Sequence, residues 1–186
     1  RLLRDAVAAV APWVRVYADA DEMLRSSELD AVVITTPVGE HVPIAVKCVS
    51  GGIPFFMEKP LATSALQARD LVAALAEKPI THMVGYMTRY IDSFERGRAL
   101  VASGCLGRIQ RVSGTIYVSQ RFDRGQGWRY DRKVSGGGVL LSQGSHLLDL
   151  LVWYFGPIVG VSAQILSNFS DDIEDFAHLM LEFRSG

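Results

Sequence analysis

The sequence predicts an α/β fold with a twisted parallel sheet in its first half, followed by an α+β fold whose mostly antiparallel sheet has helices on one face. Short apolar strand candidates alternate with helix candidates up to residue 88, as in βαβ units. From residue 89 the strand candidates are longer and fewer helices separate them. We therefore expect one domain over residues 1–88 and a second, C-terminally incomplete domain over residues 89–186.

The first half contains apolar runs bounded by turn and capping residues. Residues 31–35 are β-branched and apolar apart from Ala31, which is typical of a strand covered on both faces. Gly51 and Gly52 mark the end of one helix, and the spacing of Ser64 and Gln67 predicts a capping box at the start of another. The expected helices are 2–10, 20–26, 41–49 and 64–77, and the expected strands are 14–17, 31–35, 53–57 and 82–85.

The second half is predicted from longer patterns. Residues 176–183 alternate between two unlike faces, which favours an antiparallel strand. A loop rich in Gly, Arg and aromatic residues over 120–135 precedes a long helix, and the acidic run 171–175 reads as a solvated turn. The expected helices are 92–102 and 139–155, and the expected strands are 108–119, 159–166 and 176–183.

Composition narrows the class of protein. The 186 residues are 49% apolar and 21% charged, which fits a globular protein with a substantial core. A formal net charge of −1 argues against nucleic acid and against an anionic membrane surface, so a small molecule is the expected partner. Neither a membrane-spanning stretch nor a secretory signal is recognisable, and the two cysteines lie far apart without metal-ligand spacing. We expect a cytoplasmic protein without a metal site, and an excerpt of a longer chain.

Lys59 and His146 are the residues that could carry chemistry. Lys59 follows the strand candidate 53–57, and open α/β sheets place ligands at the carboxyl ends of their strands. His146 shares one helical stripe with Ser142, Asp149 and Trp153, at spacings i, i+4, i+7 and i+11. A lysine and a histidine together suit the oxidation of an alcohol. The alternative is a surface lysine and a solvated helix face.

Four segments stand out along the chain: Thr-Thr-Pro-Val-Gly-Glu-His at 35–41, Glu-Lys-Pro-Leu-Ala at 58–62, Val-Gly-Tyr at 84–86, and the run from Gly136 to Asp149 with its Gly-Gly-Gly and Gly-x-His-x-x-Asp patterns. In this order they resemble the Gfo/Idh/MocA family of NAD(P)-dependent oxidoreductases, which is related to glucose-fructose oxidoreductase and inositol 2-dehydrogenase. Their combination is specific, whereas Glu-Lys-Pro alone is a weak signal. The resemblance runs over nearly the whole chain.

The resemblance implies a Rossmann domain joined to a second domain, with NAD or NADP and a hydroxylated small molecule in the cleft between them. Lys59 would lie beside the nicotinamide and the reacting carbon, and His146 would act as acid or base. Ser142, and Tyr117 if it does more than pack in its strand, would contact the substrate. The implied cofactor contacts are Thr35, Thr36, Pro37, His41, Glu58, Lys59 and Pro60, together with Trp128 and Arg129, for which a role in simple loop packing is equally compatible.

Two departures from the family pattern matter. Ser142 stands where family dehydrogenases often have an aspartate, and a serine cannot share a negative charge with His146. No G-x-G-x-x-G turn precedes Ala31, so this polypeptide alone is expected to bind cofactor poorly, and the choice between NAD and NADP is open. A cofactor-binding regulator without turnover is the second hypothesis, and a purely structural α/β protein is the third. By analogy with the family, the second sheet is expected to form homo-oligomers.

Overall fold

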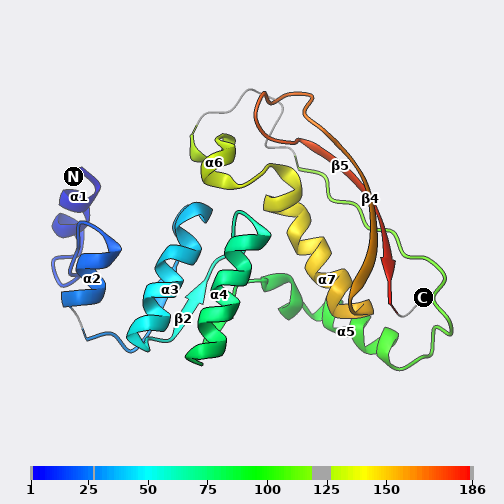
Figure 1. Ribbon diagram of the computed structural model, residues 1–186, viewed down its shortest axis with the longest axis horizontal. Helices are drawn as coiled ribbons and strands as arrows, with labels where there is room; N and C mark the ends of the chain where they lie inside the picture. The colour runs from blue at the N-terminus through cyan, green and yellow to red at the C-terminus, as the bar shows by residue number, and fades with distance from the viewer. Residues whose placement is uncertain (1, 27, 119–126, 185–186) are drawn as a thin grey trace.

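A computed structural model describes residues 2–26, 28–118 and 127–184 of the chain. The two predicted halves are a three-stranded parallel sheet with helices, and a two-stranded antiparallel sheet with helices (Figure 1). In chain order the elements are α1 (Leu2–Val10), α2 (Ala20–Ser26), β1 (Val32–Ile34), η1 (Val38–Glu40), α3 (His41–Gly51), β2 (Phe55–Met57), α4 (Ala65–Glu77), β3 (His82–Val84), η2 (Met87–Tyr90), α5 (Asp92–Ala102), η4 (Trp128–Tyr130), α6 (Arg132–Ser135), η5 (Leu140–Gly144), α7 (Ser145–Phe155), β4 (Ile158–Leu166) and β5 (Phe176–Phe183).

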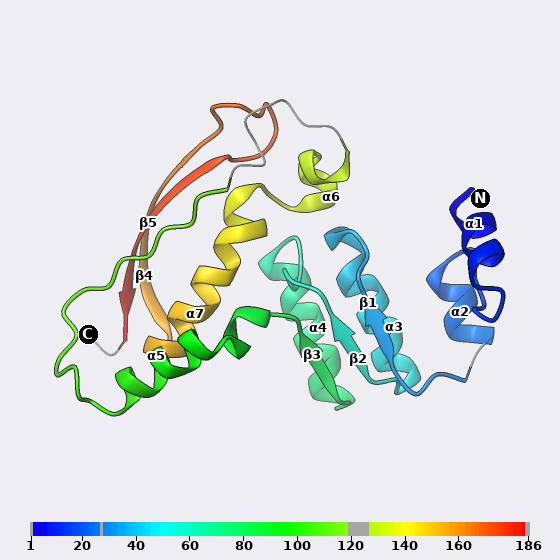
Figure 2. The same ribbon diagram turned by 180° about the vertical axis from the view of Figure 1, so that it is seen from behind.

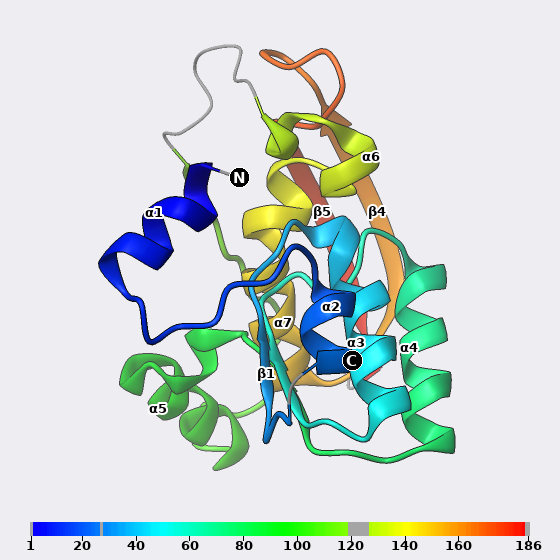
Figure 3. The same cartoon turned by 90° about the vertical axis from the view of Figure 1, so that its left-hand side faces the viewer.

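The first sheet has the order β1-β2-β3, with both pairs parallel and Ile34, Met57 and Val84 in register. Helices α3 and α4 lie side by side against one face of this sheet (Figures 1 and 3). The hydrophobic core fills that layer and includes Met57 and Leu71, whereas Val33 on the opposite face is 68% exposed. The predicted capping also forms, because the Ser64 hydroxyl accepts from the Gln67 N–H at the start of α4.

The second sheet is the antiparallel pair β4 and β5, and α7 lies along it (Figure 2). The predicted alternation of β5 is confirmed: Leu179, Leu181 and Phe183 are partly buried, while Met180 between them is exposed. At one end of this layer the rings of Phe155 and Phe183 lie 5.6 Å apart. The described helices include none that is both long enough and apolar enough to cross a membrane.

Two predicted strands are wrong. Residues 14–17 and the described part of the run 108–119 form no strand, because a strand requires a neighbour for its backbone groups. The backbone bonds found for the described residues include a single turn contact in the first segment, from Val14 N–H to the Ala11 carbonyl, and none in 108–118. Both segments have suitable β-branched residues, but local propensity alone does not make a sheet.

The acidic run 171–175 is a solvated turn only in part, because Asp171 and Asp172 are exposed but the next two residues are buried. Ile173 is fully buried, and Glu174 is 8% exposed. The Glu174 carbonyl accepts from Val139 N–H at 2.9 Å, and its carboxylate accepts from Leu140 N–H at 3.1 Å. Glu174 therefore satisfies donors at the start of the helical segment that leads into α7, where a negative charge is favourable.

Candidate active site between the two sheets

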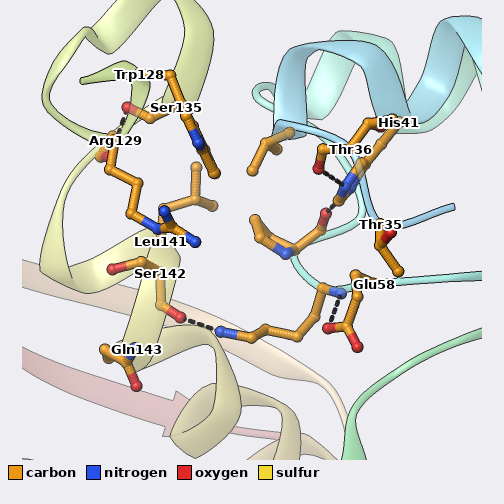
Figure 4. A pocket seen from close by; sticks show the side chains of 14 residues that line it. Thr35, Thr36, His41, Glu58, Trp128, Arg129, Ser135, Leu141, Ser142 and Gln143 are labelled. Carbon is orange, nitrogen blue, oxygen red and sulfur yellow. Dashed lines mark hydrogen bonds between the residues drawn. The ribbon is translucent and has the colours of Figure 1, made fainter. Parts of the chain in front are cut away.

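A cavity of about 610 Å³ lies where the carboxyl ends of β1 and β2 face the segment before α7. Figure 4 shows its two walls, with Thr36, His41 and Glu58 on one side and Arg129 and Ser142 on the other. The first wall consists of Thr35, Thr36, Val38, His41, Glu58, Lys59 and Pro60, and the second of Trp128, Arg129, Ser135, Gly137, Leu141, Ser142 and Gln143. Most of the residues predicted for the site thus line one cavity.

Lys59 is half-buried and crosses between the two walls. Its backbone follows β2, where the Glu58 N–H donates to the Ile34 carbonyl at 2.9 Å and extends the ladder between β1 and β2. Its ammonium group donates to the Ser142 carbonyl at 2.5 Å (Figure 4). Burial lowers the pKa of Lys59, and the charge of Arg129 lowers it further, while Glu58 opposes both. The amine is therefore a hydrogen-bond donor whose charge is less favoured than that of a surface lysine.

The Ser142 carbonyl belongs to a π-helical turn, η5, instead of the regular helix predicted over 139–155. Such turns shift the usual backbone pairing and occur frequently at functional sites. The predicted i, i+4 stripe from Ser142 to His146 is therefore interrupted. The Ser142 hydroxyl is buried and has no hydrogen-bond partner among the described residues, so this cavity-lining group is free to bind a ligand hydroxyl.

Two of the three glycines before this turn, Gly136 and Gly138, are required by close packing. Gly136 has φ = +79°, and a Cβ there would lie 2.7 Å from Thr63. A Cβ on Gly138 would lie 1.8 Å from the Glu174 carbonyl oxygen. The glycine run therefore lets one segment approach both the turn after β2 and the loop before β5.

His146 lies one residue into α7 and is not among the residues that line the cavity. Burial lowers the pKa of His146, as does the positive charge of Lys59, so these two groups interact electrostatically. Its Nδ1 is buried without a partner among the described residues, and its ring meets Tyr86 edge-on at 6.0 Å. A neutral imidazole in this position can accept a proton near pH 7.

Sequence reasoning missed Arg89, which holds α7 from η2, the short helix after the last strand of the first sheet. Its guanidinium forms a bidentate pair with Asp149, at 2.7 and 2.6 Å, and lies 5.5 Å from the Trp153 ring centroid. Asp149 lies one helical turn after His146, and its charge opposes the lowering of the His146 pKa. Arg89 carries no local motif and is 60 residues away in sequence, so only its tertiary contact identifies it.

The remaining predicted residues differ in position. The Thr36 hydroxyl is buried without a partner among the described residues, and the Arg129 guanidinium stacks 4.4 Å from the centroid of Trp128. Pro37 precedes η1 but is not among the cavity-lining residues. The structure does not bring Tyr117 to the cavity: its side chain is 93% exposed, on a segment that pairs with no strand in the described part of the chain.

Family models match both halves of the sequence. Residues 3–86 match the oxidoreductase family with an NAD-binding Rossmann fold, and residues 94–186 match the GFO/IDH/MocA C-terminal domain. Curated relatives include scyllo-inositol 2-dehydrogenase (NADP(+)) IolW of Bacillus subtilis, 26% identical over 92% of this chain and 48% of its own length. Inositol 2-dehydrogenase of Leifsonia xyli is 37% identical over 60% of this chain and 33% of its own.

Solved structures agree with this match. WlbA dehydrogenase from Bordetella pertussis, in complex with NADH and UDP-GlcNAcA, has a TM-score of 0.84 at 26% identity, over 98% of this chain and 53% of that one. GenD2 from gentamicin A biosynthesis, in complex with NAD, has a TM-score of 0.78 at 31% identity, over 96% and 51%. The chain spans 40–48% of the length of the first curated relatives it matches.

Proposed function

Because this chain belongs to the Gfo/Idh/MocA family of oxidoreductases, we propose that the protein transfers hydride between a nicotinamide cofactor and a CH–OH carbon of a sugar, polyol or related molecule. The observation that carries the proposal is the cavity of about 610 Å³ that Lys59 spans. Burial lowers the pKa of Lys59, and the charge of Lys59 in turn lowers the pKa of His146. A proton acceptor and an ammonium donor acting on one oxygen are what alcohol oxidation requires.

The residues present fit the nicotinamide and ribose end of such a cofactor. The Thr36 hydroxyl is buried and has no hydrogen-bond partner among the described residues, so it can pair with a ribose hydroxyl. Val38 and Trp128 line the same cavity and offer apolar surfaces against which a flat ring can pack. Thr35, Thr36, Glu58 and Arg129 would hold this end. NAD or NADP, when bound, accepts or donates the hydride. The described residues include no glycine-rich turn for the pyrophosphate.

Lys59 and His146 would divide the acid–base work. In the oxidative direction Lys59 orients the substrate oxygen and stabilises its developing negative charge, while the neutral imidazole of His146 takes the hydroxyl proton. In the reductive direction His146 returns that proton to the oxygen. The Ser142 hydroxyl would bind a second substrate hydroxyl.

The substrate class is supported by relatives named as inositol and levoglucosan dehydrogenases. The direct test is to incubate the purified full-length protein with a panel of polyols, sugars and their oxidised forms, and to follow nicotinamide absorbance with NAD and with NADP. Turnover of at least one CH–OH substrate is expected. Cofactor binding without turnover across the panel would instead support the second candidate, a regulator, which Ser142 in place of the usual aspartate favours.

We also propose that copies of this protein associate through the β4–β5 sheet. Leu166, Phe176 and Met180 share one face of this sheet and are 41%, 43% and 65% exposed. Such apolar exposure on a sheet surface is typical of an association site. Light scattering after gel filtration would detect a homo-oligomer, and a monomer at micromolar concentration would contradict this assignment.

A further inference from the structure

His41 is a buried titratable residue that the proposed chemistry does not use. It begins α3, its side chain is 1% exposed, and both of its ring nitrogens face backbone carbonyl oxygens. Nδ1 lies 2.9 Å from the Pro60 oxygen, and Nε2 lies 2.9 Å from the Thr36 oxygen. Carbonyl oxygens only accept, and a neutral imidazole carries a hydrogen on one ring nitrogen, so the tautomer decides which of the two carbonyls a neutral ring bonds.

The two carbonyls belong to the two turns that build one wall of the cavity. Thr36 follows β1, and Pro60 follows Lys59 in the turn after β2. Backbone pairing joins these turns as far as Glu58, whose N–H donates to Ile34. Beyond Glu58, the imidazole of His41 links the two turns, and the carbonyl that it contacts in the second turn belongs to Pro60, the residue after Lys59.

We propose that His41 is a positioning residue, which holds the Lys59 turn against the Thr36 turn by donating from Nδ1 to the Pro60 carbonyl. Because Lys59 spans the cavity to reach Ser142, a small shift of its backbone moves the ammonium away from the reacting oxygen. Misplacement of a catalytic group by about 1 Å can reduce turnover by about 100-fold. His41 thus acts through Lys59 and not as a direct cofactor contact.

Two substitutions separate the two contacts. In His41→Asn the amide nitrogen replaces Nδ1, because both nitrogens are bonded to Cγ. In His41→Gln the amide nitrogen replaces Nε2, because both nitrogens are three bonds from Cβ. Asn can therefore keep the contact with Pro60, and Gln the contact with Thr36. This test rests on the proposed oxidoreductase activity of the full-length protein. His178→Asn, on the exposed face of β5, is the matched control and should leave kcat unchanged.

We expect His41→Asn to retain kcat within about fivefold, and His41→Gln to lose about 10- to 100-fold, with KM changed less than kcat in both. Equal losses in the two variants, or no loss in either, would overturn the proposal. A merely structural role would reduce the amount of folded protein in both variants without separating their kcat values.

Nitrogen NMR of the wild-type protein with ¹⁵N-labelled histidine gives a readout that needs neither turnover nor a stable variant at position 41. The His41 signals are assigned by elimination with substitutions of the protein's other histidines, among them His82, His146 and His178. A hydrogen on Nδ1 is expected, and a bare Nδ1 would overturn the proposal. A wild-type protein that turns over no substrate would refute the oxidoreductase function, while this measurement would still decide whether His41 donates to Pro60.

Discussion

The two halves of the molecule hold their site residues by different means. Lys59 extends from a turn above a continuous hydrophobic core that includes Met57 and Leu71. His146 lies on α7 beside a two-stranded sheet whose outer residues are exposed, and polar contacts from Glu174 and Arg89 fix the ends of its segment. Burial of apolar area positions the first residue, whereas a few directional contacts position the second.

This difference predicts how each half responds to a substitution. Loss of a polar contact around α7 leaves the core of the first sheet intact, so geometry and pKa change before the fold is lost. The lysine, by contrast, has a rigid base, and its own removal should abolish catalysis without unfolding the protein.

The largest expected effect comes from Lys59→Met, which keeps a long side chain and removes the ammonium. Loss of one donor aimed at a developing charge should reduce kcat by about 1,000-fold. Lys78→Met is the matched control, because Lys78 also donates to a backbone carbonyl, that of Ser50, at 2.7 Å, but on the surface. Steady-state kinetics measures both. A Lys59→Met enzyme within tenfold of wild type would remove Lys59 from the mechanism.

Gly138→Ala tests how much the close packing of Gly138 against Glu174 contributes to the stability of the second half. The new Cβ would lie 1.8 Å from the Glu174 carbonyl oxygen, so the loop before β5 must move. We expect a loss of about 3 kcal/mol in the free energy of unfolding, as for overpacked sites. Gly51→Ala, near the end of α3, should change it by less than about 1 kcal/mol. Urea denaturation followed by circular dichroism measures both, and equal effects would contradict the packing argument.

Most helices and the first sheet could be predicted from the sequence because their signals are local. Ser64 with Gln67 marks a helix start, and residues 31–35 form a β-branched run. The strands expected at 14–17 and 108–119 were wrong because pairing depends on a neighbouring strand, which no local pattern reveals.

The candidate site also contains some features that local sequence motifs predict and others that they do not. Lys59 and Ser142 line the cavity, and both belong to motifs that can be read in the sequence. Arg89 and the burial of Glu174 depend on contacts between distant segments, and the π-turn at Leu140–Gly144 changes pairing inside an apparently regular helix. The sequence pattern carried no signal for any of these three features.

Asp149→Asn sharpens the comparison by weakening the contact that holds α7. The Asp149 charge opposes the lowering of the His146 pKa, so its removal should lower that pKa further. Because His146 acts as a base only when neutral, the acid limb of the kcat/KM profile for oxidation should move to lower pH. We also expect a loss of kcat of about tenfold.

The control for Asp149→Asn is Asp21→Asn, which breaks the exposed pair between Asp21 and Lys47 at 2.6 Å. Exposed pairs contribute little, so both the pH profile and kcat should be unchanged. An acid limb that moves to higher pH in Asp149→Asn would show that Asp149 does not act on His146 through its charge.

The smallest expected effect is on stability against pH. The pKa of His146 in the folded protein lies below its ordinary value of 6.5, so between the two values the unfolded chain binds more protons. Stability should therefore rise with pH through that window and fall as the pH decreases. The other shifts bear on different ranges, since the lowered pKa values of Asp21 and Asp175 act below pH 3.8. The change should be about 0.5 kcal/mol, because solvent screens a half-buried ring. Urea denaturation between pH 5 and about 7 should show this slope in wild type and a smaller one in His146→Gln. An unchanged slope in the variant would mean that the imidazole titrates as it does in the unfolded chain, and that α7 does not bury it as the structure indicates.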